Sequence, residues 1–405
     1  MGDTRADRAT VLVLSQYYLP AYRAGGGLRV VARLVETLGQ EFHFRIVTTD
    51  RDEGDTVPLP GVRAGEWQQV GNAQVLYLPP NGIARSILRA LRTEPYDLLH
   101  INGVFEPTFD IVPLLYRRAR LAPVKPTLVT PHGDLLPGAL RIKSRKKRAY
   151  LAFAKATRLF AGVLWHATDE LEADGIRVVF GANARIRVTP CIITTGFDSL
   201  PPRTVAKPAG RLRAVYLSKV APKKNLHLAI GMLAQLRGEI SLGIYGAKCD
   251  PPYWAVCEAA IAGLPGHVTV QHHGAVPQDE VPRILRDHDV FLMPTVGENY
   301  GYAIIESLSA GCPVVISQAT PWRGLAGANA GHDIPLQDTG GFVRSLQRLT
   351  DMTEAEHGRW REGARAYART HPIVTGAVEQ SRLLLEAATA GVRRAAKLKV
   401  TAADE

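Results

Sequence analysis

Residues 290–317 read VFLMPTVGENYGYAIIESLSAGCPVVIS. The apolar runs at residues 290–293 and 313–316 both fit strands that are buried on both faces, which is the pattern of central strands in a parallel sheet. Between them, residues 303–310 fit a helix, and Gly311 separates this helix from the second strand. A strand, a loop, a helix and a second strand in this order form a βαβ unit, so the stretch predicts an α/β fold with a parallel sheet.

The same alternation extends along the chain in two blocks. Residues 28–38 carry apolar side chains at helical spacing, and further strands are predicted in both blocks. Two doubly wound, Rossmann-like domains therefore fit the pattern, with ligands expected where strands end. The predicted strands of the first block are residues 10–15, 44–49, 98–101, 127–130 and 163–167, and those of the second are 212–217, 240–245, 268–270, 290–293 and 313–316.

A stretch rich in proline and glycine, beginning near Thr194, separates the two blocks and predicts a linker. The expected organisation has four parts. One arrangement that fits the sequence has the last part packing back on the first domain. The parts are an N-terminal acceptor domain at 1–197, a linker at 198–210, a C-terminal donor-binding domain at 211–375 and a helical tail at 376–405.

The chain has 405 residues and a formal net charge of +11, which suits an anionic partner. The densest basic run, Arg141 to Arg148, fits either a solvated helix face or contact with an anionic membrane or a diphosphate-linked lipid. Nucleic acid is not expected, because no stacking aromatic residues stand among these cations. The N-terminus lacks an apolar core and no cysteines form a CxxC pair, so we expect a cytoplasmic protein, peripheral at the inner membrane face if it meets a membrane. The oligomeric state is not indicated.

Two carboxylates, Glu298 and Glu306, stand near the start of the helix at residues 303–310. Free backbone N–H groups at a helix start attract phosphate or sugar oxygens, and Gly301 allows close approach of a ligand. A carboxylate can accept hydrogen bonds from vicinal hydroxyls, so the pair could hold a sugar and a ribose. The alternative is an ordinary helix-terminal charge at Glu298 and a solvated residue at Glu306.

Two features of the first block also follow strands. Gly25, Gly26 and Gly27 immediately precede the helix predicted from Leu28 and fit a phosphate or sugar nest, or else a plain turn. A dinucleotide fingerprint is excluded because these glycines do not directly follow the first strand. His132 ends a strand and precedes a glycine. His100 and His166 also end strands and are less specific candidates, and Glu170 and Glu172 are weaker again.

The stretch Pro294–Ser317 resembles the E-x7-E segment of glycosyltransferase family 4, a family of retaining enzymes with the GT-B fold. The segment at Tyr216–Asn225 resembles the family's diphosphate-binding loop, with Lys219 in the usual arginine place and Lys224 in the lysine place. Two cations there would stabilise the leaving diphosphate. The resemblance around residues 131–150 is to bacterial enzymes that build cell-surface polysaccharide.

This resemblance implies transfer of a hexose-type sugar from a nucleotide-diphosphate sugar to a glycan or lipid-linked acceptor, by a front-face route, with no metal and no resident cofactor. A nucleotide-sugar epimerase of the same architecture and a non-catalytic nucleotide-sugar-binding protein remain as alternatives. The residues implied in catalysis are His132, Glu298 and Lys224, and those implied in donor binding are Gly26, Gly27, Lys219, Lys224, Glu298, Asn299, Tyr300, Gly301, Tyr302 and Glu306.

Overall fold

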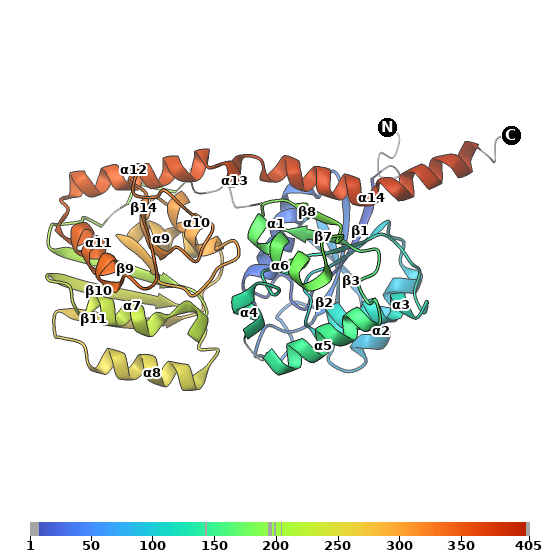
Figure 1. The fold of residues 1–405 in the computed structure, drawn as a ribbon, viewed down its shortest axis with the longest axis horizontal. Coiled ribbons are helices and arrows are strands. Elements are labelled where there is room, and N and C mark those ends of the chain that lie inside the picture. Colours follow the sequence, from blue (N-terminus) through green and yellow to red (C-terminus); the bar gives the residue numbers. More distant parts are fainter. Residues whose placement is uncertain (1–7, 142–143, 193–196, 198–199, 204, 402–405) are drawn as a thin grey trace. The chain divides into compact units, whose positions relative to one another are not determined.

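The computed structural model describes residues 8–141, 144–192, 197, 200–203 and 205–401, with side chains as far as residue 390. The chain divides into two compact units, of which the first is discontinuous in sequence (Figure 1). The first unit comprises residues 1–192 and 376–405, and the second comprises residues 193–375. Parts of the predicted linker (198, 199 and 204) and of the basic run (142 and 143) lie outside the described residues.

The first unit contains an eight-stranded sheet in the order β3-β4-β2-β1-β5-β6-β7-β8, in which only the β3–β4 pair is antiparallel. Its strands are β1 (Thr10–Leu14), β2 (His43–Thr49), β3 (Trp67–Val70), β4 (Ala73–Leu78), β5 (Leu98–Ile101), β6 (Thr127–Val129), β7 (Leu164–Ala167) and β8 (Ile186–Val188). Its helices are α1 (Gly26–Leu38), α2 (Ile83–Thr93), α3 (Val112–Arg118), α4 (Pro137–Arg141), α5 (Ser144–Ala156), α6 (Glu170–Phe180) and α14 (Ala377–Thr401), with a π-helical turn at Pro107–Ile111.

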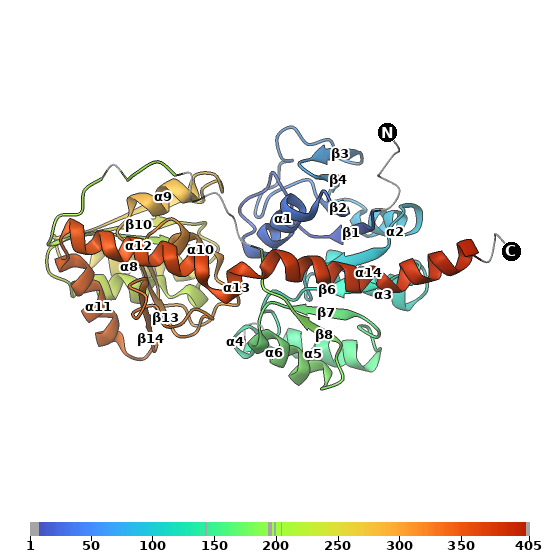
Figure 2. The same ribbon diagram turned by 90° about the horizontal axis from the view of Figure 1, so that it is seen from above.

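Alternating side chains of the strands divide the core of the first unit into two layers. Leu12 and Leu14 of β1 pack with α2, α3, α5 and α6, whereas Val11 and Val13 pack with α1 and α14. This division follows from the two-residue period of a strand, which sends successive side chains to opposite faces. Figure 2 shows α14 running across this sheet.

The second unit contains a six-stranded parallel sheet in the order β11-β10-β9-β12-β13-β14. Its strands are β9 (Arg211–Leu217), β10 (Glu239–Tyr245), β11 (Val268–Gly274), β12 (Val290–Met293), β13 (Val314–Ser317) and β14 (Gly331–Ile334). Its helices are α7 (Leu226–Leu233), α8 (Pro251–Ala262), α9 (Val281–Asp287), α10 (Tyr302–Ser309), α11 (Thr339–Asp351), α12 (Glu354–Thr370) and α13 (Pro372–Thr375), with a 3-10 turn at Pro222–Lys224.

The order of strands reverses once in each sheet. In the first sheet the chain moves outward from β1 to β2 and later resumes on the other side of β1 with β5; in the second sheet β9 and β12 have the same relation. The loops that leave two such strands separate to opposite sides and open a crevice at their carboxyl ends. Ligand-binding residues are therefore expected in the loops that follow β1, β5, β9 and β12.

Candidate functional site

In the second unit, the loops that follow β9 and β12 are bonded to each other. The backbone N–H of Val296 donates to the carbonyl of Lys223 at 2.9 Å, and the Asn225 side chain donates to the carbonyl of Pro294 at 2.9 Å. Across this junction, the Lys224 ammonium forms an ion pair with the Glu298 carboxylate, and both side chains are largely buried. The fold thus brings together two predicted site residues that are 74 positions apart in sequence.

Left-handed backbone conformations shape both loops. Asn225 has a φ of 54° and immediately precedes α7. Asparagine tolerates this conformation better than most residues do. Gly301 has a φ of 75° and begins α10, and a Cβ there would lie 2.9 Å from the Ile304 side chain. Any larger residue at position 301 would therefore be strained by the positive φ and would force the Ile304 side chain to move.

Glu306 lies on α10 and is 3% exposed. Its carboxylate accepts a hydrogen bond from the Gln278 side chain at 2.7 Å. Gln278 belongs to the loop after β11, so a third strand end contributes to this cluster, and the sequence analysis did not identify it. The side-chain amide oxygen of Gln278 is buried and has no hydrogen-bond partner among the described residues. A hydroxyl or N–H group of a ligand would satisfy it.

The remaining predicted donor residues differ in exposure. Lys219 directly follows β9 and is half-buried, as are Asn299 and Tyr302. The Tyr300 side chain is only 4% exposed and packs edge-on against Trp322, whose indole N–H donates to the Tyr300 carbonyl at 2.7 Å. Tyr300 is therefore a packing residue that supports the loop.

In the first unit, Asn102 links three of the loops that follow strands. Its amide nitrogen donates to the Ser15 hydroxyl and to the Gly27 carbonyl, each at 3.1 Å. Its amide oxygen lies 2.6 Å from Nε2 of His132. Because this oxygen can only accept, Nε2 must carry the proton and Nδ1 must be an acceptor. Gly26 and Gly27 form the first turn of α1, so that helix begins two residues before the predicted start.

His132 is uncharged at neutral pH. Burial, and to a smaller extent the nearby His166, lower the pKa of His132 to about 3. Its backbone has a φ of 52°, and the following Gly133 has a φ of 78°. A buried carboxylate holds this turn, since Glu172 accepts hydrogen bonds from the Gly133 N–H and from the Thr168 N–H. Glu172 was only a weak candidate in the sequence, and its position identifies it as a residue that orients His132.

The same unit contains a pocket at the carboxyl ends of β1 and β5, between Gly27 and His132. Three acidic residues line it, and one of them, Asp110, is buried. Desolvation, reinforced by the charges of Glu106 and Asp134, raises the pKa of Asp110 to about 8, so its carboxyl group is mainly protonated at neutral pH. The lining residues are Ser15, Gln16, Tyr17, Ala24, Gly27, Leu28, Asn102, Gly103, Glu106, Asp110, His132 and Asp134.

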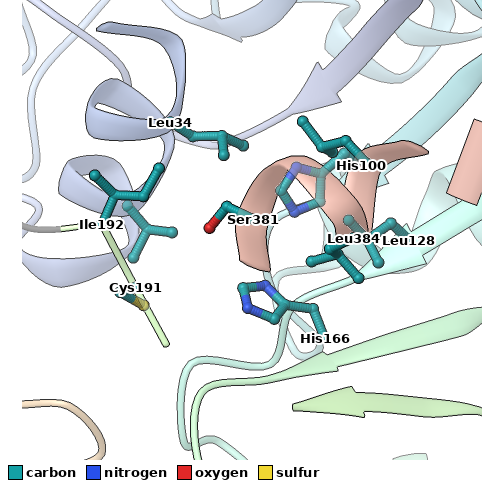
Figure 3. A pocket seen from close by; sticks show the side chains of 10 residues that line it. Leu34, His100, Leu128, His166, Cys191, Ile192, Ser381 and Leu384 are labelled. Atoms are coloured by element: carbon teal, nitrogen blue, oxygen red, sulfur yellow. The ribbon is translucent and has the colours of Figure 1, made fainter. Parts of the chain in front are cut away.

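His100 and His166 lie beneath α14 and do not line that pocket. Together with Ser381 and Leu384 they line a small apolar cavity (Figure 3). His166 Nε2 donates to the Thr189 carbonyl at 2.8 Å, so its Nδ1 accepts from the Thr130 hydroxyl, which in turn accepts from His100 Nε2 at 2.8 Å. This chain of bonds gives both histidines a structural role.

No group of three or more histidine, cysteine, aspartate or glutamate side chains has a metal-binding arrangement within the described part of the chain. None of the helices in residues 8–401, apart from the gaps given above, is long and apolar enough to cross a membrane.

Each unit matches a separate glycosyltransferase domain model. Residues 25–191 match the "Glycosyl transferase 4-like domain", and residues 202–365 match the "Glycosyl transferases group 1" domain. With the two Rossmann-like units, these matches define the class of protein: the chain belongs to the GT-B glycosyltransferases.

Several curated proteins are similar over part of their length. A glycosyltransferase of Escherichia coli K12, WcaL, whose name places it provisionally in colanic acid biosynthesis, is 31% identical over 162 residues, which are 38% of this chain and 40% of that protein. The O-antigen chain mannosyltransferase B of Escherichia coli is 26% identical over 38% of this chain and 39% of its own length. This chain thus aligns with well under two thirds of either relative.

Solved structures align with nearly the whole chain. Sucrose-phosphate synthase from Thermosynechococcus elongatus superposes with a TM-score of 0.65 at 17% identity and covers 98% of this chain and 100% of its own. HepE from Anabaena, in complex with UDP and glucose, superposes with a TM-score of 0.68 at 15% identity and covers 95% and 100%. At these identities the likeness establishes the fold alone.

Proposed function

We propose that the protein is a retaining glycosyltransferase that moves a hexose-type sugar from a nucleotide-diphosphate sugar to a glycan or lipid-linked acceptor. The observation that carries the proposal is the cluster at the carboxyl ends of β9 and β12, where Lys224 pairs with Glu298 and Gln278 holds Glu306. The names of the relatives, in colanic acid and O-antigen synthesis, favour cell-surface polysaccharide as the product. The site of action would be the inner face of the membrane.

The cluster has the groups that donor binding requires. Lys219 and Lys224 supply two positive charges for a diphosphate, whose negative charge grows as the glycosidic bond breaks. Glu298 would hold hydroxyls of the donor sugar, and Glu306 would hold the ribose. Lys224 is neutralised by Glu298 in this structure. A diphosphate carries more negative charge than one carboxylate, so donor binding would draw Lys224 to the phosphates and release Glu298 for the sugar.

The transfer step we propose takes place on one face of the sugar. The acceptor oxygen forms a bond to the anomeric carbon on the face from which the diphosphate leaves, and the bond from that carbon to the diphosphate oxygen breaks. The hydroxyl proton passes to the departing phosphate, so neither a covalent enzyme adduct nor a metal is required. His132, neutral and oriented by Asn102, would contact the donor sugar, and the pocket beside it would receive the acceptor.

Two substitutions test the donor cluster. Lys224→Ala should lower kcat by about 10²- to 10³-fold, because it removes a charge that stabilises the leaving group. Glu306→Ala should weaken donor binding about 10- to 100-fold, because it removes a charged hydrogen-bonding group. Glu258→Ala, on the exposed side of α8, removes a carboxylate from the same unit and serves as the control. Near-wild-type turnover by both site variants would refute the assignment.

The donor nucleotide can be found without knowing the acceptor. UDP-, GDP- and ADP-sugars should protect the chain from heat unfolding according to their affinities, because a ligand that binds the folded state stabilises it. Product analysis then separates the alternatives. Inversion at C2 of the donor sugar without transfer would indicate an epimerase, and protection with no product after long incubation would indicate a binding protein.

A further inference from the structure

Helices α2, α3 and α5 of the first unit form a surface without acidic residues. They cover the face of the sheet opposite to α1 and α14 (Figure 1). Residues 83–93, 111–133 and 135–168 contain no aspartate or glutamate. Of the acids near this surface, Glu94 pairs with Arg45, and on α6 the side chains of Glu170 and Asp174 both pair with Arg177.

Hydrogen bonds join the three helices into one continuous surface. The Tyr116 hydroxyl of α3 donates to the Ala84 carbonyl of α2 at 3.1 Å. The Arg118 guanidinium, also on α3, donates to the Thr157 carbonyl after α5 at 2.9 Å. Exposed cations follow this surface from helix to helix, and we term it the basic face. It includes Arg89, Arg118, Arg120, Arg148, Lys155 and Arg158.

Large apolar side chains are exposed among these cations. Phe153 on α5 is 47% exposed, and Leu121 and Val124, which follow α3, are 54% and 62% exposed. Cations beside protruding apolar side chains suit a bilayer interface, where the apolar groups enter the headgroup boundary and the cations meet lipid phosphates. A nucleic acid would instead favour aromatic side chains aligned for base stacking.

Two of the arginines occupy backbone positions that glycine would occupy at lower cost. Arg120 and Arg158 have φ values of 57° and 52°, and each stands two residues beyond the end of a helix. The left-handed conformation is strained for any residue with a Cβ. Replacing either arginine by glycine would remove a charge from the basic face and relieve this strain at the same time.

We propose that the basic face is a docking surface for a bilayer that contains anionic phospholipids. The sequence suggested membrane contact only for the basic run Arg141 to Arg148, whereas the proposed surface spans three helices. It also includes exposed apolar side chains, which the basic run does not supply. It concerns attachment and does not depend on the sugar-transfer reaction. Phe153, Leu121 and Val124 would enter the interface, and the surrounding arginines would contact phosphate groups.

Vesicle co-sedimentation of the full chain tests the proposal. The wild type should bind vesicles of equal parts phosphatidylglycerol and phosphatidylcholine, and should not bind phosphatidylcholine alone. The double variant Arg120→Gly/Arg158→Gly should bind about 30-fold more weakly, from the contribution of a cation near an anionic surface. The control Arg63→Ser/Arg344→Ser removes two highly exposed charges from other places and should bind as the wild type does.

Further measurements separate the electrostatic contribution to binding from the apolar contribution, and test duplex DNA as an alternative partner. The defect of the double glycine variant should vanish in high salt, whereas that of Phe153→Ser should persist, because only the first is electrostatic. Equal binding of the wild type and the double glycine variant to anionic vesicles would overturn the proposal. Tighter binding to duplex DNA than to vesicles, lost in the same variant, would also overturn it and would identify a nucleic-acid surface.

Discussion

The pairing of Lys224 with Glu298 is the kind of contact that sequence reasoning can anticipate. Each residue follows a predicted central strand, and parallel strands deliver their carboxyl ends to one edge of a sheet. Gln278 and Asp52 could not be predicted, for a different reason. The side chain of each forms hydrogen bonds with residues of a distant segment, and no local sequence pattern fixes which polar group will face it. Asp52, for instance, accepts from the backbone N–H groups of Tyr22 and Arg23.

Gln278 should matter for donor affinity and little for the chemical step. Gln278→Leu removes the hydrogen bond to Glu306 and should raise the KM for the donor about tenfold or more, as expected for a bond to a charged group, with kcat nearly unchanged. Gln235→Leu is the matched control, because Gln235 is exposed at the end of α7. Initial rates over a range of donor concentrations would decide. A fall in kcat at constant KM would contradict this role.

His100 should make the first unit sensitive to acid. Burial is the main cause that lowers the pKa of His100 to about 3, and the charges of His166 and His132 add to it. In the folded state His100 stays neutral until the pH approaches 3, whereas in the unfolded chain it takes up a proton near pH 6.5. The contribution of His100 to the free energy of unfolding is therefore fully present above pH 6.5 and is lost as the pH falls toward 3. At pH 5 the loss from this one group is about 2 kcal/mol.

A substitution isolates this contribution. His100→Gln keeps a side chain that can donate to Thr130 but cannot titrate, so it should flatten the decline in stability between pH 7 and pH 5 by about 2 kcal/mol. Hydrogen exchange of β5 and β6 in urea, corrected for the intrinsic effect of pH, reports on this unit specifically. His273→Gln, at an exposed position, should leave the decline unchanged. An unaltered decline in His100→Gln would show that other groups cause it.

At the scale of elements, the central strands other than β4 could be predicted, whereas of the four edge strands only β11 could. The predicted strands at 10–15, 98–101 and 290–293 correspond to β1, β5 and β12. They could be predicted because a strand that is buried on both faces has a nearly unbroken run of apolar residues. The missed strands include β3 (WQQV) and β14 (GHDI), which lie at sheet edges. An edge strand needs few apolar residues, so its sequence resembles that of a loop.

Helix α14 should stabilise the unit on which it packs. Leu385 is 1% exposed against α1 and the sheet, whereas its neighbour Leu383 is 50% exposed. Leu385→Ala should lower the unfolding free energy of the first unit by about 2–5 kcal/mol, and Leu383→Ala should change it by less than about 0.5 kcal/mol. Urea unfolding, followed by amide hydrogen exchange in β1, would compare the unfolding free energies of the two variants. Equal effects would mean that α14 does not pack on the first unit in solution.

At the scale of the whole molecule, the net charge of +11 is unevenly placed. Composition alone indicated an anionic partner, but it did not say where such a partner would sit. The fold gathers three acid-free segments onto one face of one unit, and this result depends on how α2, α3 and α5 cover the sheet. A run of lysines and arginines is visible in sequence, whereas a surface built from three separate segments is not.

The discontinuous first unit has a consequence for the order in which the molecule forms during synthesis. Residues 193–375 are made after most of the first unit and before α14. At typical elongation rates this interval lasts about 10–40 s, long enough for the second unit to fold first. During that time Val30 and Leu34 on α1, which share a cavity with Leu384 and Leu385, lack the helix α14 beside them. The nascent first unit therefore exposes apolar side chains of α1 until α14 emerges.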